Sequence, residues 1–72
     1  MGAKAAALAT TTSTDLLLLE LISHGASDET IGRKLHLPVA DVRAGIHGVV
    51  RELGARNREH AVAIALKSGL IQ

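Results

Sequence analysis

The stretch PVADVRAGIHGVVREL, from Pro38 to Leu53, decides the fold, because its apolar residues recur at steps of three and four. This spacing places them on one face of an α-helix, and that face must be buried. The apolar positions are Val39, Val42, Ile46, Val49, Val50 and Leu53. The opposite face carries small residues and hydrogen-bond donors, namely Ala40, Arg43, Ala44, His47 and Arg51. The pattern predicts a helix over 39–53 with one core face and one exposed polar strip.

A shorter helix is predicted immediately before this stretch. Ser27 fits an N-cap, the next two positions are acidic, and the helix should extend over 28–35. Gly32 lies in its interior, where glycine weakens a helix by about 1 kcal/mol relative to alanine. We therefore expect Gly32 to allow close approach of the 39–53 helix. Because only a short break ending in Pro38 separates the two helices, they form a helix-turn-helix arrangement.

A helix over 13–24 is predicted upstream, with Thr12 as its N-cap. Its core stripe is expected to contain Leu18, Leu19, Leu21 and Ile22. Two further leucines, Leu16 and Leu17, make the helix more apolar than its core-facing side alone requires. They are either packed by the Ala-rich segment over 1–11, which we expect to be flexible, or exposed for a partner.

A last helix is predicted over 58–68, with Asn57 as its cap. Residues 61–66 are all apolar, so this helix is hydrophobic almost all round. One side would complete the core of an all-α, four-helix domain over 12–72. The other side suits contact with a second copy of the chain, and we assign this dimer contact to Ala61, Ile64 and Ala65.

The composition excludes several classes of function. The chain has 72 residues and no cysteine, so it forms one small domain without disulfides or thiolate metal sites. It has no aromatic residue, and therefore lacks the stacking surfaces that bind single-stranded nucleic acid. Its four histidines show no metal-ligand spacing, and no nucleophile lies near a base and an orienting group. We therefore expect no metal, no cofactor and no enzymatic activity.

The sequence shows no sign of a membrane segment. The longest apolar run, LLLL at 16–19, is too short to span a bilayer, and the N-terminus lacks the apolar core of a signal peptide. We expect a cytoplasmic protein with no membrane partner.

Basic charge is concentrated around the 39–53 helix, although the net charge is only +1. The basic residues between positions 31 and 58 are Arg33, Lys34, Arg43, Arg51, Arg56 and Arg58, against Asp41 and Glu52. Together with the polar strip, this distribution indicates duplex nucleic acid as the partner. An ordinary solvated helix face is the alternative explanation of the same charges.

Several segments occur in a characteristic order and spacing. They are LLLLELISHGAS at 16–27, IGRKLHLP at 31–38, VR at 42–43, VVRELGARNREHAV at 49–62 and GLI at 69–71. In this order they resemble the LuxR/FixJ/GerE-type DNA-binding domain, a four-helix unit at the C-terminus of many bacterial transcription regulators. The resemblance implies that helix 39–53 enters the major groove of duplex DNA in the bacterial nucleoid. It also implies that helix 58–68 pairs two subunits on a two-fold-related site.

The resemblance further implies which side chains meet DNA. The bases are met from the positions of Arg43, Ala44 and His47. Arg43 can donate two bonds to guanine, Ala44 can touch a thymine methyl group, and His47 can donate to a purine acceptor or a phosphate. Contacts to the DNA backbone are expected from Ser27, Asp28, Lys34, Arg51 and Arg58.

Four positions depart from the family pattern, at Pro38, Asp41, Gly45 and Gly48. Asp41 would either repel the phosphate backbone or stabilise the first turn of its own helix. Gly45 and Gly48 remove two potential contacts and loosen the helix by about 1 kcal/mol each. The alternative function is therefore a protein-interaction module, or an antagonist that pairs with a related regulator and binds DNA weakly or not at all. A third reading is a sigma-factor-like module that docks onto RNA polymerase.

Overall fold

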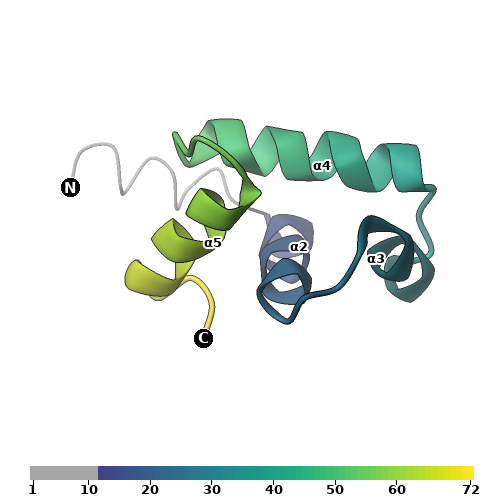
Figure 1. Cartoon of the computed structure of the whole chain (residues 1–72), viewed down its shortest axis with the longest axis horizontal. Helices are drawn as coiled ribbons and strands as arrows, with labels where there is room; N and C mark the ends of the chain where they lie inside the picture. The colour runs from purple at the N-terminus through teal and green to yellow at the C-terminus, as the bar shows by residue number, and fades with distance from the viewer. Residues whose placement is uncertain (1–11) are drawn as a thin grey trace.

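The computed structural model describes residues 12–72, which form four α-helices without strands (Figure 1). These helices are α2 (Ser13–Ser23), α3 (Asp28–Leu35), α4 (Val39–Glu52) and α5 (Arg58–Lys67). The predicted all-α, four-helix fold is confirmed, and every predicted boundary agrees with the observed one to within one residue. The segment over 1–11, which was expected to be flexible, lies outside the described residues. From residue 12 onward, no helix combines the length and the apolar character needed to cross a membrane.

Side-chain caps begin three of these four helices. Thr12 and Asp15 form a reciprocal capping box, in which each side chain accepts the other residue's backbone N–H at 3.1 Å. Ser27 and Asn57 cap α3 and α5 by accepting a backbone N–H three residues further on, at 3.1 and 2.8 Å. α4 has no side-chain cap and begins after Pro38. These local signals explain why the helix starts were predictable.

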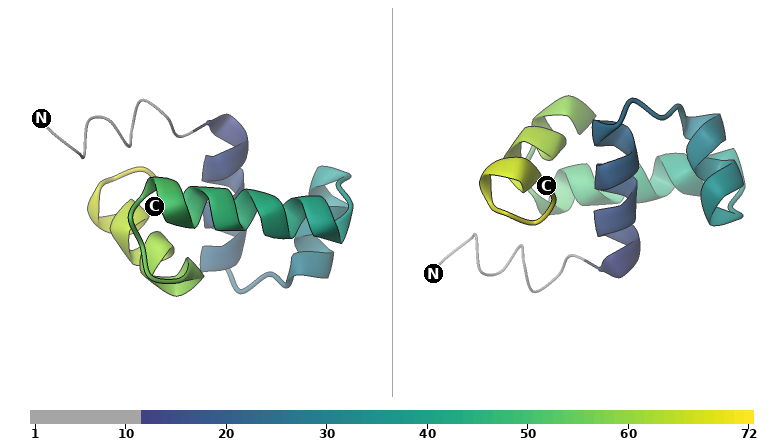
Figure 2. Two further views of the ribbon diagram at one scale, coloured as in Figure 1. Left: turned by 90° about the horizontal axis from the view of Figure 1, so that it is seen from above. Right: turned by 90° about the horizontal axis from the view of Figure 1, so that it is seen from below.

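α4 crosses the other three helices. Seen from above, α4 extends across α2, with α5 on one side and α3 on the other (Figure 2). Two buried clusters fill the space beneath it, one on each side of α2. The cluster toward α3 contains Leu18, Ile31, Val42 and Ile46. The cluster toward α5 contains Leu19, Val49, Ala61, Ala65 and Ile71.

The apolar residues of α2 and α4 lie mostly where the sequence places them. Leu18 and Leu19 are buried, and Leu21 and Ile22 pack at the edge of the cluster toward α3. The two surplus leucines differ, because Leu16 packs against the cluster around Leu19 whereas Leu17 is 47% exposed. On α4, the buried residues are Val42, Ile46 and Val49, while Val39, Val50 and Leu53 are half-buried.

Gly32 is buried at the corner between α3 and α4. A Cβ at this position would lie 2.7 Å from the carbonyl oxygen of Leu37, and 3.7 and 3.8 Å from methyl groups of Val42 and Val39. The backbone N–H of Leu37 also donates to the Gly32 carbonyl at 2.8 Å. A close approach therefore exists at Gly32, but its partner is the turn at Leu37 and not, as was predicted, the 39–53 helix. Residues of α4 lie only at ordinary contact distance.

The two glycines inside α4 have different surroundings. A Cβ at Gly45 would lie 2.9 Å from Cδ1 of Leu18, so this position faces α2. The interpretation that Gly45 removes an outward contact is therefore wrong, because a side chain there would point at the core. At Gly48 a Cβ would meet nothing within 4 Å.

Gly48→Ala should raise the free energy of unfolding by about 1 kcal/mol, because alanine favours a helix and has room here. Thermal denaturation followed by circular dichroism should show a midpoint higher by roughly 4–8 °C. Gly25→Ala is the matched control, since Gly25 also has open space around it but has a φ of +83°. There alanine should lower the midpoint, and a rise at both positions would contradict this explanation.

Candidate nucleic-acid interface

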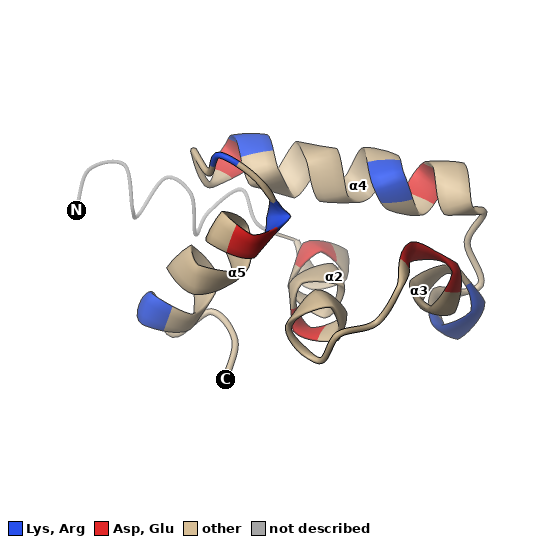
Figure 3. Cartoon of the chain, in the orientation of Figure 1, with Lys and Arg blue, Asp and Glu red and all other residues tan. Residues whose placement is uncertain are grey.

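The outer strip of α4, defined as Ala40, Arg43, Ala44, His47 and Arg51, is exposed along its whole length. The helical spacing explains this, because the other side of α4 is occupied by the two core clusters. Figure 3 shows the charged positions of α4 near its two ends. Asp41 is exposed in the first turn of α4, where its negative charge interacts favourably with the helix dipole and stabilises the helix.

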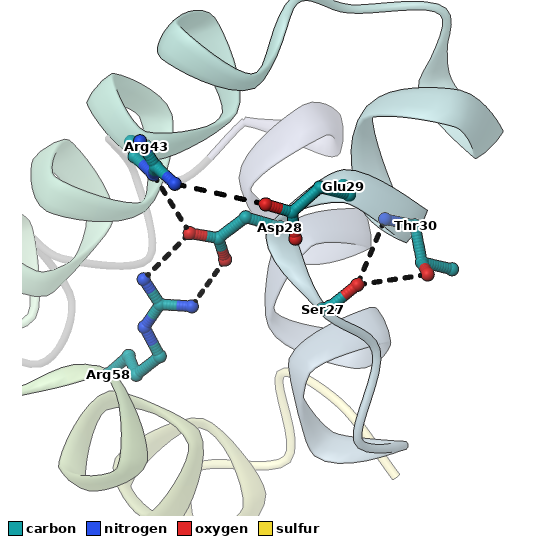
Figure 4. Close-up of polar contacts among 6 residues, drawn as sticks. All are labelled: Ser27, Asp28, Glu29, Thr30, Arg43 and Arg58. Atoms are coloured by element: carbon teal, nitrogen blue, oxygen red, sulfur yellow. Dashed lines mark hydrogen bonds and ion pairs between the residues drawn. The ribbon is translucent and has the colours of Figure 1, made fainter.

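A network of ion pairs joins three helices beside this strip (Figure 4). The carboxylate of Asp28, at the start of α3, accepts two hydrogen bonds from Arg58 of α5, Nη1 to Oδ1 at 2.6 Å and Nη2 to Oδ2 at 3.3 Å. It also accepts one from Nε of Arg43 on α4 at 3.3 Å. Nη2 of Arg43 lies 3.9 Å from Glu29, which is beyond hydrogen-bond distance. Thus Asp28 of α3 connects Arg43 of the outer strip with Arg58 of α5.

The charges in this network change the pKa of two groups. Hydrogen bonds from Arg58 are the main cause that lowers the pKa of Asp28 below its usual 3.8, against the smaller opposing effect of burial. The charge of Arg58 and the contact with Arg43 lower it further. The same hydrogen bonds from Arg58 to Asp28 raise the pKa of the Arg58 guanidinium. Both groups therefore stay charged across the physiological range.

Asp28→Asn should lower the free energy of unfolding at pH 7 by about 1 kcal/mol, because Arg58 loses a charged partner while keeping some solvent access. The folded protein holds the pKa of Asp28 below the unfolded value near 3.8. The contribution is therefore fully present above that value and is lost as the pH falls through the folded pKa. Urea denaturation of both proteins at pH 7, 5 and 3 should show a constant difference that shrinks only at the lowest pH. A difference that persists unchanged at acid pH would contradict the ionic origin.

A hollow of about 250 Å³ lies between α4 and the loop that precedes α5. Its lining includes four basic side chains, those of Arg43, His47, Arg56 and Arg58. The loop is held in place because the backbone N–H of Arg56 donates to Nδ1 of His60 at 3.0 Å. Arg56 was not among the predicted site residues, since no helical pattern linked it to α4.

The predicted contact residues are distributed unevenly. The structure brings Asp28, Arg43 and Arg58 together. Ser27 precedes Asp28, and its hydroxyl caps α3 by accepting a hydrogen bond from the backbone N–H of Thr30. Lys34 and Arg51 lie apart from this group, exposed in the last turns of α3 and α4.

The predicted dimer contact on α5 is wrong in two of its three residues. Ala61 and Ala65 are completely buried in the core beneath α4, so neither can meet a second chain. Ile64 is half-buried. The exposed positions of α5 are Glu59, Ala63, Leu66 and Lys67. The apolar run over 61–66 could not show which side faces the core, because both sides are equally hydrophobic.

The chain is similar to YxjL of Bacillus subtilis (strain 168), which is described as an uncharacterized transcriptional regulatory protein. The two are 28% identical over 61 residues, which cover 85% of this chain and 28% of YxjL. The chain therefore spans less than a third of the length of that relative. No family model and no solved structure matches the chain.

Proposed function

We propose that the chain is the DNA-binding part of a transcription regulator of the LuxR/FixJ/GerE type, which places α4 in the major groove of duplex DNA. The observation that carries this proposal is the outer strip of α4, exposed from end to end and supported by α3 at the Gly32 corner. The similarity to YxjL supports it, because that protein is described as a transcriptional regulatory protein.

The chemistry of the strip suits base recognition. Arg43 can donate two parallel hydrogen bonds to guanine, Ala44 can contact a thymine methyl group, and His47 can donate to a purine acceptor. Arg51, two turns beyond Arg43, is assigned to a phosphate. Arg56, which lines the hollow next to the strip, adds one exposed positive charge for the same backbone.

A homodimer would read two related half-sites, as expected for a two-fold-symmetric DNA site. We assign the contact to the exposed face of α5, with Ala63 and Leu66 at its centre. Leu66 is 47% exposed, and a large exposed apolar side chain beside a small residue suits close helix packing.

Fluorescence anisotropy with mixed-sequence duplex between about 50 and 200 mM salt tests the proposal. The logarithm of the binding constant should fall linearly with the logarithm of salt concentration, and Arg51→Ala should reduce the slope by about 1. Arg33→Ala is the matched control, because it removes one exposed positive charge from the last turn of α3 that is assigned to no DNA contact, and it should leave the slope unchanged. Absence of binding at the lowest salt concentration would contradict the proposal.

A second candidate function is a protein-interaction module that pairs with a related regulator through α5. The observation that favours it is the neutralisation of Arg43 and Arg58 by Asp28 and Glu29, which weakens attraction to phosphate. Such a protein would form mixed dimers with the related regulator and show no salt-dependent duplex binding.

A further inference from the structure

The carboxylate of Asp28 has a fixed orientation. Its side chain is only 13% exposed, and Arg58 holds both of its oxygens from α5. Bidentate pairing with a planar guanidinium restricts rotation of a carboxylate more than a single contact does. Asp28 is therefore a rigid hydrogen-bond acceptor at the side of α4.

Arg43 meets this acceptor through one nitrogen, Nε, at 3.3 Å. Its two terminal amino groups, Nη1 and Nη2, donate no hydrogen bond within residues 12–72, and the side chain is 62% exposed. The terminal pair is the donor set that binds O6 and N7 of guanine. Anchoring at Nε thus leaves both terminal amino groups without a hydrogen bond, and Nη2 has only a longer ion pair with Glu29, at 3.9 Å (Figure 4).

We propose that Asp28 is a positioning residue that orients Arg43 for base recognition and thereby sets the base preference of α4. This inference rests on the proposed DNA-binding function. An arginine side chain has many rotamers, and binding must immobilise it. With Nε already held by Asp28, and Asp28 held by Arg58, part of that ordering is complete before DNA arrives.

Glu29 provides a matched control for the charge of Asp28. The two carboxylates are adjacent and both face Arg43, but only Asp28 is within hydrogen-bond distance. Asp28→Asn and Glu29→Gln each remove one negative charge beside the strip. A difference between the two variants therefore reports the hydrogen bonds that Asp28 accepts from Arg43 and Arg58, not the change in net charge.

The test begins with selection of a preferred duplex by the wild-type protein. Competition binding then compares this duplex with one changed at the base pair whose recognition is lost in Arg43→Ala. For Asp28→Asn, we expect the preference to fall by about two- to tenfold, while affinity for unrelated duplex does not fall. Glu29→Gln should keep the wild-type preference and bind unrelated duplex slightly more tightly.

The outcomes separate the two proposals. If the wild-type protein selects a duplex and Asp28→Asn keeps its preference, or Glu29→Gln loses it equally, the inference about Asp28 is overturned and the proposed function stands. If Asp28→Asn instead gains affinity for all sequences without losing preference, Asp28 only neutralises charge, and the inference is again overturned. If the wild-type protein binds no duplex, the proposed function fails and the inference fails with it.

A measurement on the unmodified protein does not depend on the folding of a variant. Nitrogen-15 relaxation of the arginine Nε–H groups reports side-chain order on the picosecond to nanosecond timescale. In the DNA-free protein, Nε–H of Arg43 should be more ordered than that of Arg51, which lies exposed on the same strip. Equal mobility of these two groups would overturn the inference.

Discussion

Arg43→Ala should abolish the preference for one base pair of the bound site, a loss of about 1–3 kcal/mol in discrimination, or roughly 5- to 150-fold. The reason is geometric, because the exposed terminal edge of Arg43 can match the two acceptors of guanine. Affinity for unrelated duplex should fall much less, since only one positive charge is removed. Competition binding against duplexes that differ at single base pairs measures both effects.

Arg43→Lys separates recognition from charge. Lysine keeps the positive charge but lacks the planar pair of donors. It also lacks the Nε–H group that donates a hydrogen bond to Asp28. This variant should lose most of the base preference while keeping the salt dependence of the wild-type protein. If Arg43→Ala weakens all sequences equally, Arg43 is a phosphate contact and α4 does not read bases through it.

Gly32→Ala should lower the free energy of unfolding by about 2 kcal/mol, even though alanine is intrinsically the better helix former. A Cβ at Gly32 would lie 2.7 Å from the carbonyl oxygen of Leu37, and a backbone atom cannot move without shifting the turn. Urea and thermal denaturation should show the loss, with a midpoint lower by roughly 8–16 °C.

Gly48→Ala is the internal reference for this measurement. Both glycines lie inside helices, but only Gly32 has a close neighbour. The two substitutions should therefore change stability in opposite directions. A rise in the unfolding midpoint for Gly32→Ala would show that the corner between α3 and α4 relaxes easily.

The fold could be predicted largely from local signals. Thr12, Ser27 and Asn57 mark helix starts through caps that the structure confirms, and the spacing of apolar residues on α4 separates its buried face from its exposed strip. The orientation of α5 could not be predicted, because its apolar residues surround the helix. Ala61 and Ala65 were therefore assigned to the surface although both are completely buried.

The site could be predicted in part, for a different reason. Helical spacing identified Arg43 as exposed, but Asp28 contacts residues 15 and 30 positions away, and no local pattern reports such contacts. Asp28 fits the first turn of α3 so well that its sequence context suggests only a role in the helix dipole. Its pairing with Arg58 depends on the packing of α5 beside α2 and α4.

The contact between Gly32 and Leu37 has a consequence for protein engineering. The turn approaches Gly32 through the main chain of Leu37, by its carbonyl oxygen and by its N–H, so this contact does not depend on the side chains of the outer strip. Ala40, Ala44 and His47 contribute nothing to that corner or to the core clusters. A library randomised at these three positions should keep the docking geometry constant while varying the chemistry presented to the groove. The domain is thus a scaffold on which new sequence preferences can be selected, provided that position 32 remains glycine.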